Sequence, residues 1–222
     1  MNNFLHKPIV IDNELKEVTI EGKRFYETPG GIFPSVTTVV GWDKQNFFAD
    51  WRRKNPEESK RVTSRGTKFH SLIENYLNNE EIDFDNMIPN FKVLFNQLKP
   101  EIDKIQNIVA LETPLWSQTL GLAGRTDCIA EYDGKLSIID FKASSKEKRK
   151  SDIENYFTQA TAYALMFQER TGIRIDNFAI LIACEDGLRQ VFTGQPLKYV
   201  RHLSNLIKRY KEVNDVPRAE DN

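Results

Sequence analysis

Apolar residues change their spacing along the chain, and these changes separate helical from extended segments. The segment 18–28 alternates in character around a central Glu-Gly-Lys, which predicts a short hairpin. The spacing over 34–77 is helical, with an interruption near Pro56. One helix face there carries apolar residues three and four positions apart: Phe69, Leu72, Ile73, Tyr76 and Leu77. Another helix is expected at about 90–104, with a break or kink at Pro100.

The second half of the chain has short apolar runs rich in β-branched residues. These runs predict strands at 108–116, 122–132, 135–143, 178–186 and 188–194. Asp133-Gly134 forms a strong two-residue turn between the second and third of them. Helices are expected at about 152–170, ended by Gly172, and at about 197–213, before a polar tail.

This order of elements predicts an α/β fold in which a mixed sheet lies between helical layers. We expect a single domain over 1–222, because no shift in composition suggests a boundary. Its parts are an N-terminal hairpin and helical region to about 105, a sheet core at about 106–195, and a C-terminal helix and tail at about 196–222.

The composition limits the classes of function. The net charge is -1, which argues against a protein that coats nucleic acid through overall positive charge. The two cysteines are too few for an iron–sulfur cluster or a four-cysteine zinc site. No apolar run approaches the roughly 18 residues of a membrane span, so no membrane contact is expected. The N-terminal segment lacks an apolar signal core, and we expect a soluble cytoplasmic protein.

The predicted hairpin brings two acidic residues together. With the turn at Asp133-Gly134, Asp127 near the start of one strand falls directly across from Asp140 near the end of the other. Their Cβ atoms would then be roughly 5 Å apart on one face of the sheet. Two carboxylates so placed repel each other unless a cation lies between them or one is protonated.

Two further charged residues fit a metal site beside this pair. Strand alternation places Lys142 on the same face as Asp140, and Glu112 can join from the preceding strand. Carboxylates with an adjacent ammonium form a plausible Mg²⁺ site for phosphodiester hydrolysis, in which the ion activates water and neutralises charge. The competing interpretation is a structural ion pair on a hairpin, and the pattern alone does not decide between them.

Several motifs in this region resemble those of a known family, the RecB-like branch of the PD-(D/E)XK nucleases. They are Gly124-Arg125-Thr126-Asp127, Asp140-Phe141-Lys142, a Gln159…Tyr163 pair on the next helix, and an upstream Arg65-Gly66-Thr67-Lys68-Phe69-His70. The order Pro34-Ser35-Val36-Thr37, Trp51, His70…Glu74 and Ala110-Leu111-Glu112 most resembles the mitochondrial genome maintenance exonucleases. The likeness covers about residues 34–167.

The resemblance implies a restriction-endonuclease-like core and a divalent metal, Mg²⁺ or Mn²⁺. It implies metal ligands at His70, Asp127, Asp140 and the main-chain carbonyl of Phe141, and it makes Lys142 the catalytic lysine. Gln159 and Tyr163 would flank the scissile phosphate or the strand, and Glu112 is a weaker assignment. The mitochondrial members need a targeting leader, and none is visible here, so we expect a bacterial or viral setting.

A basic segment indicates how nucleic acid is held. Residues 51–68 carry seven Lys or Arg against two Glu, and aromatic residues precede them. Cations for phosphates and aromatic rings for bases suit single strands, although a solvated helix face would have the same pattern. The predicted DNA-binding residues are Trp51, Arg52, Arg53, Arg65, Lys68, Arg125, Ser144 and Lys146.

The predicted function is therefore a metal-dependent DNA exonuclease acting on single-stranded ends or flaps. In the similar exonucleases, helical sequence before the core arches over the site and admits single strands only, and we carry this over as a hypothesis. Two alternatives remain open. One is a structure-specific endonuclease with the same site, and the other is a non-catalytic DNA-binding subunit of the same fold.

Overall fold

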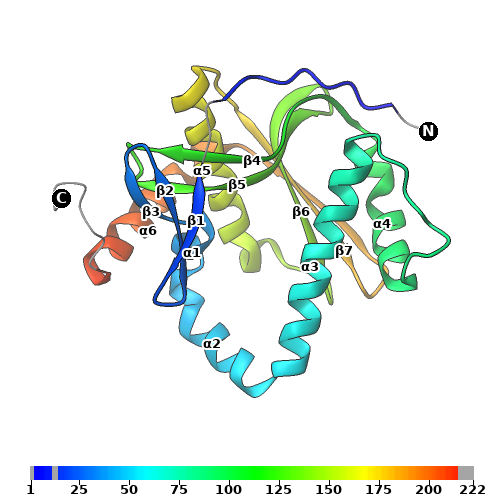
Figure 1. The fold of residues 1–222 in the computed structure, drawn as a ribbon, viewed down its shortest axis with the longest axis horizontal. Coiled ribbons are helices and arrows are strands. Elements are labelled where there is room, and N and C mark those ends of the chain that lie inside the picture. Colours follow the sequence, from blue (N-terminus) through cyan, green and yellow to red (C-terminus); the bar gives the residue numbers. More distant parts are fainter. Residues whose placement is uncertain (1–2, 12–14, 215–222) are drawn as a thin grey trace.

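Two β-sheets organise the chain, for which a computed structural model describes residues 3–11 and 15–214 (Figure 1). Most of the predicted polar tail lies outside the described residues. The larger sheet has the strand order β4-β5-β6-β7-β8, and the smaller has the order β1-β2-β3. The strands are β1 Lys16–Ile20, β2 Lys23–Thr28, β3 Gly31–Pro34, β4 Ile105–Ser117, β5 Leu122–Tyr132, β6 Lys135–Ser144, β7 Asn177–Cys184 and β8 Arg189–Gly194.

Helices flank the larger sheet and precede it in the chain. The α-helices are α1 Val36–Val40, α2 Gln45–Lys54, α3 Pro56–Leu77, α4 Pro89–Ile102, α5 Glu154–Thr171 and α6 Val200–Val213, with short 3-10 turns at Trp42–Lys44, Lys150–Ile153 and Pro196–Tyr199. The β6-α5-β7 segment is a crossover that makes β6 and β7 parallel, whereas the other paired strands are antiparallel. The predicted mixed sheet between helices is confirmed.

Each face of the larger sheet packs against its own set of helices. Strand alternation sends Ile138 toward a core cluster shared with α1, α5 and α6, and sends Ile139 toward a second cluster shared with α3 and α4. Both side chains are fully buried. The sheet is therefore covered on both faces, and residues that alternate along β6 belong to opposite sides of the molecule.

The structure confirms the predicted turns and corrects some details. Asp133 and Gly134 have φ values of 49° and 73°, as a tight two-residue turn requires. The predicted hairpin at 18–28 forms, but β3 adds a third strand that the pattern did not indicate. Of the break or kink predicted at Pro100, the break is wrong, because α4 continues to Ile102. Pro100 lies in the last turn, where it removes one hydrogen bond to the carbonyl four residues earlier, and the helix ends two residues later.

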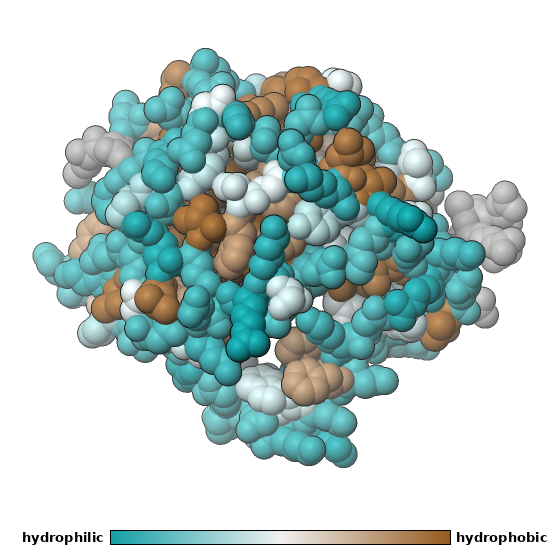
Figure 2. All heavy atoms as spheres, turned by 180° about the vertical axis from the view of Figure 1, so that it is seen from behind, coloured by the Kyte–Doolittle hydropathy of each residue, from teal (hydrophilic) through white to brown (hydrophobic). Residues whose placement is uncertain are grey.

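One segment stands away from this core. Helix α2 has no buried residue, and between Gly41 and Lys68 only Arg65 is buried. In Figure 1 α2 and the first half of α3 form an arch below the sheet, and the view from behind shows a hollow between the arch and the body (Figure 2). We call residues 41–64 the arch segment. No helix of the described residues has the length and apolar character needed to cross a membrane.

Candidate active site

The predicted acidic pair lies where two strands of the sheet separate. Strands β5 and β6 pair from Tyr132 with Lys135 to Cys128 with Ile139, and Asp127 and Asp140 follow immediately after the last pair. The prediction that Asp127 lies near the start of its strand is wrong, because β5 extends back to Leu122 to pair with β4. Both acids therefore lie at a fork in the sheet, where main-chain groups lose their strand partners.

Asp127 replaces one of the lost main-chain partners at the fork. Its Oδ2 atom accepts a hydrogen bond of 2.9 Å from the N–H group of Phe141, the residue after Asp140. Buried main-chain donors need an acceptor, so this contact fixes the carboxylate and the separated strands together. The Phe141 side chain itself points into the core cluster on the α3 and α4 face.

Glu112 lies beside Asp127 on the other neighbouring strand. Pairs on both sides of it, Leu111 with Cys128 and Thr113 with Thr126, place it opposite Asp127. Its φ of 42° is left-handed, which costs a non-glycine residue of the order of 1–2 kcal/mol. The Glu112 carbonyl accepts a hydrogen bond of 2.6 Å from Arg125, which supports this conformation. The sequence pattern did not reveal this backbone distortion.

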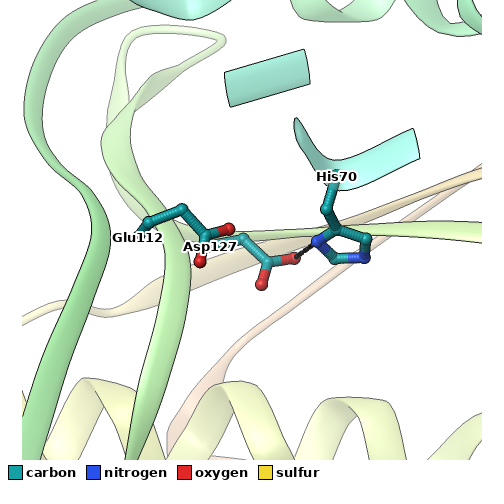
Figure 3. A group of neighbouring side chains, drawn as sticks. All are labelled: His70, Glu112 and Asp127. Atoms are coloured by element: carbon teal, nitrogen blue, oxygen red, sulfur yellow. Dashed lines mark ion pairs between the residues drawn. The ribbon is translucent and has the colours of Figure 1, made fainter. Parts of the chain in front are cut away.

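Helix α3 contributes a nitrogen atom to the same place. Nδ1 of His70 lies 3.4 Å from Oδ2 of Asp127. One ligand atom from each of His70, Glu112 and Asp127 lies within 4.8 Å of the others, and Figure 3 shows the three side chains pointing toward one another. Oxygen atoms with one imidazole nitrogen form a donor set suited to Mg²⁺ or Mn²⁺.

Only one of the two carboxylate oxygens of Asp140 accepts hydrogen bonds. Its Oδ1 atom accepts hydrogen bonds from Lys142 Nζ at 2.6 Å and from Gln159 Nε2 at 3.3 Å. Its Oδ2 atom is buried and has no hydrogen-bond partner among the described residues. A buried carboxylate oxygen without a partner is costly, and a bound cation would satisfy it. His70, Glu112 and Asp127 therefore fit a divalent metal, and Asp140 has a carboxylate oxygen that no described residue occupies.

The charges at the site agree with this interpretation. Burial, followed by repulsion from Asp127 and Glu74, raises the pKa of the Glu112 carboxyl to about 7. Burial also raises the pKa of Asp140 above its ordinary value, although the charge of Lys142 opposes it. Carboxylates that resist ionisation side by side are those whose repulsion a divalent cation relieves.

Lys142 is held as a cation. Burial works against its charge, but the carboxylates of Asp140 and Asp127 outweigh that effect and raise the pKa of the ammonium above its ordinary value. The Nζ atom also lies 5.2 Å from the ring centre of Tyr156 on α5, a cation–π contact. A lysine held in its charged form stabilises negative charge and cannot serve as a general base.

Helix α5 closes the site from the opposite side. Gln159 contacts Asp140, and the buried Tyr163 lies against Gly124 of β5. A Cβ atom at Gly124 would approach the Tyr163 hydroxyl oxygen to 2.8 Å. A residue larger than glycine at this position would therefore require the Tyr163 ring to shift.

Two cavities meet at Lys142, which lines both. The first, of about 430 Å³, contains the candidate metal ligands His70, Glu112 and Asp127 and is bordered by Arg24, Tyr26 and Thr37 of the N-terminal region. The second, of about 1020 Å³, lies between the arch segment and the end of β6, and Tyr156 lines it. The lysine therefore stands at the junction of a smaller acidic chamber and a larger space beneath the arch.

The structure separates the residues predicted to bind DNA. Of these, the second cavity is lined by Trp51, Arg52, Arg65, Ser144 and Lys146, and the first by Arg125. Arg53 and Lys68 are not among the residues lining either cavity. Ser144 is buried and donates its hydroxyl hydrogen to the Lys146 carbonyl at 2.7 Å. Arg65 is also buried and forms an ion pair of 2.8 Å with Glu185.

Sequence reasoning missed contacts that span long distances in the chain. Tyr156 belongs to none of the motifs found in the sequence, and neither does Glu185, which follows β7. Phe47 and Phe48 of α2 are two of the aromatic residues that precede the basic segment. In the structure they are 67% and 45% exposed, and both line the second cavity. Exposed aromatic residues at a cavity wall are a signal that only the fold can supply.

The chain belongs to the PD-(D/E)XK nuclease superfamily, whose model matches residues 46–189. Nucleases of this superfamily use divalent metals, in agreement with the donor set described above. The match includes the arch segment from α2 onward and most of the larger sheet.

Particular relatives are exonucleases. The chain is 28% identical over 177 residues to human mitochondrial genome maintenance exonuclease 1, covering 70% of this chain and 50% of the relative. The mouse protein of that name is 28% identical over 173 residues, covering 69% and 50%. The chain thus spans about half the length of these relatives. A solved candidate exonuclease from Eubacterium rectale has a TM-score of 0.44 at 15% identity, covering 71% of this chain and 72% of that one.

These relatives correct one prediction. We expected a cytoplasmic protein in a bacterial or viral setting, because no targeting leader was visible at the N-terminus. The mammalian relatives are mitochondrial by name, and this contradicts the expected location. The reasoning failed because the absence of a recognisable leader was given more weight than the family pattern.

Proposed function

We propose that the chain is a metal-dependent deoxyribonuclease that hydrolyses phosphodiester bonds at the ends or flaps of single-stranded DNA. The observation that carries the proposal is the position of Lys142. This lysine joins an acidic chamber suited to a divalent cation and a basic, aromatic space suited to a strand. A strand running from one cavity to the other would bring a phosphate to the lysine.

The metal would be held by His70, Asp127 and Asp140, with Glu112 beside them. The carbonyl of Phe141 is the additional ligand expected from the family resemblance. A bound Mg²⁺ or Mn²⁺ lowers the pKa of a water molecule and offsets the negative charge that develops on the phosphate. The remaining chemistry is assigned to the side chains around it.

Lys142 would contact the phosphate oxygens and stabilise the developing negative charge. Asp140 holds the ammonium at 2.6 Å, and Tyr156 supports it from the side of the second cavity. Gln159 fixes Asp140 from α5, so the lysine is oriented before the substrate arrives. Preorganised charges of this kind avoid the cost of reorientation during the reaction.

The second cavity supports the preference for single strands. Lys44, Arg52, Lys146 and Lys148 supply cations along its walls, and aromatic side chains of α2 face it. Stacking of an unpaired base on an aromatic ring contributes about 1–3 kcal/mol, and paired bases cannot use it. Because the arch segment is covalently continuous with the core at both ends, a strand beneath it would enter by a free end.

The test is degradation of end-labelled DNA by the intact chain in Mg²⁺, Mn²⁺ or chelator. Lys142→Ala and Asp140→Ala are expected to lower the rate about 100- to 1000-fold while folding is retained. Lys135→Ala is the matched control, since this lysine lies at the exposed start of the same strand. Full activity in folded Lys142→Ala and Asp140→Ala would refute the assignment.

The form of the substrate separates the proposal from its alternatives. Linear single strands blocked at the 5′ or the 3′ end reveal which end is required, and a circular single strand should remain intact. Cleavage of the circle would instead indicate a structure-specific endonuclease. Tight DNA binding without turnover at any metal concentration would indicate a non-catalytic subunit.

A further inference from the structure

Glu185 forms a bracket between the arch and the catalytic sheet. Its two carboxylate oxygens lie 2.7 Å from Arg61 Nη1 and 2.8 Å from Arg65 Nη1, both on α3. The Glu185 side chain is 20% exposed and that of Arg65 is 8% exposed. The Arg61 side chain is 45% exposed, so the Arg65 pair is the one shielded from water and from screening by salt.

The other end of the bracket is rigid. Glu185 follows β7, and its N–H group donates a hydrogen bond of 2.9 Å to the carbonyl of Ser144 at the end of β6. Strand β6 carries both Asp140 and Lys142. The carboxylate is therefore fixed relative to the site by main-chain contacts that a side-chain substitution leaves in place.

Only the N-terminal half of helix α3 depends on the ion pairs with Glu185 for its position. Its apolar anchors Phe69, Ile73 and Leu77 all lie in the C-terminal half, near His70. In the N-terminal half, Arg65 is the one buried residue. That half lines the second cavity through Ser59, Val62, Thr63 and Arg65. Without the ion pairs, the one buried residue of this half would lose its charged partner, while the half bearing His70 would keep its apolar anchors.

We propose that Glu185 is a positioning residue that holds the arch-side half of α3 as a wall of the passage for single-stranded DNA. This role of Glu185 rests on the proposed function. In it, Glu185 affects the binding of the DNA strand and leaves the metal centre unchanged. It also reassigns Arg65, which forms an ion pair with Glu185, from phosphate contact to support of the wall.

The sign of the effect on DNA binding separates this role from simple electrostatics. Glu185→Gln removes a negative charge beside a basic cavity, and by charge alone the variant should bind DNA more tightly. If the bracket positions the wall, the variant should bind more weakly. If the N-terminal half of α3 occupied its binding-competent position in about a tenth of the molecules, the apparent affinity for DNA would fall about ten-fold.

The experiment measures binding of a labelled oligothymidylate in chelator, where no turnover occurs. We expect the Kd of Glu185→Gln to rise about ten-fold above the wild-type value. In Mg²⁺, KM should rise while kcat and the metal concentration for half-maximal activity stay close to wild type. The control is Glu57→Gln, because Glu57 lies on the same helix in an exposed pair with Lys60 and outside the bracket.

Hydrogen exchange tests the same role without DNA. In Glu185→Gln, amides of the arch segment should exchange faster than in wild type, with α4 and the larger sheet unchanged, and Glu57→Gln should match wild type. Equal or tighter DNA binding by Glu185→Gln, or unchanged exchange in its arch, would overturn the proposal. If wild type neither binds nor cuts single strands, the proposed function fails, and the exchange result still decides the role of Glu185.

Discussion

Replacing Glu112 with glutamine should stabilise the protein in the absence of divalent metal. Glu112 lies next to Asp127 and has a pKa raised from 4.5 to about 7 by burial and by neighbouring carboxylates. The folded state holds this proton more tightly than the unfolded chain does. Stability is therefore lost as the pH rises from about 4.5 through 7, and ionised Glu112 opposes folding above that range.

The size of the effect follows from the same values. A difference between 4.5 and about 7 corresponds to about 3 kcal/mol, at roughly 1.4 kcal/mol per pKa unit. Because the carboxyl is partly exposed, solvent screening reduces this by about half, to about 1.5 kcal/mol. For a chain of this length, that gain corresponds to an increase in Tm of about 3–6 °C.

The assay is thermal unfolding at pH 5 and pH 8, in chelator and in saturating Mg²⁺. Glu112→Gln should have the higher Tm at pH 8 in chelator, and its advantage should shrink at pH 5, where wild-type Glu112 holds its proton. Adding Mg²⁺ should stabilise wild type more than the variant, because the cation relieves a repulsion that the variant lacks. A variant less stable than wild type at pH 8 in chelator would show that the carboxylates are not in conflict.

Three further predictions concern the side chains around the metal site. His70→Ala should raise the Mg²⁺ concentration needed for half-maximal activity about 10- to 100-fold, and an unchanged titration would remove His70 from the ligand set. Tyr156→Phe should keep near wild-type kcat, whereas Tyr156→Leu should lower it several-fold, since the ring supports Lys142; equal rates would exclude the cation–π contact. Gly124→Ala should displace Tyr163 and reduce activity, which a crystal structure of the variant with Tyr163 unmoved would contradict.

Local patterns predicted the sheet well because its signals lie close together in the chain. The run 122–132 coincides with β5, and the turn at Asp133-Gly134 formed as expected. The hairpin then placed Asp127 and Asp140 at neighbouring positions, as the turn chemistry required. These features depend on residues a few positions apart, where propensity and alternation are informative.

Contacts made across the fold could not be predicted in this way. The left-handed backbone of Glu112 depends on packing between strands. A glutamate at that position does not indicate such a conformation in the sequence. Arg65 looked like a phosphate ligand because its partner Glu185 is 120 residues away in the chain. Likewise, the Asp127 carboxylate contacts His70 on α3, whereas the Asp140 carboxylate contacts Gln159 on α5. These contacts form only when both helices are packed against the sheet.

The turn at Asp133-Gly134 carries no chemistry, and both of its residues are exposed. The number of residues in this turn nevertheless determines which side chains of β6 face α5. Adding or removing one residue there would slip the hairpin register by one position and exchange Asp140 for Phe141. Relatives that retain activity should thus keep the number of these turn residues constant, and should carry at both positions residues that tolerate positive φ.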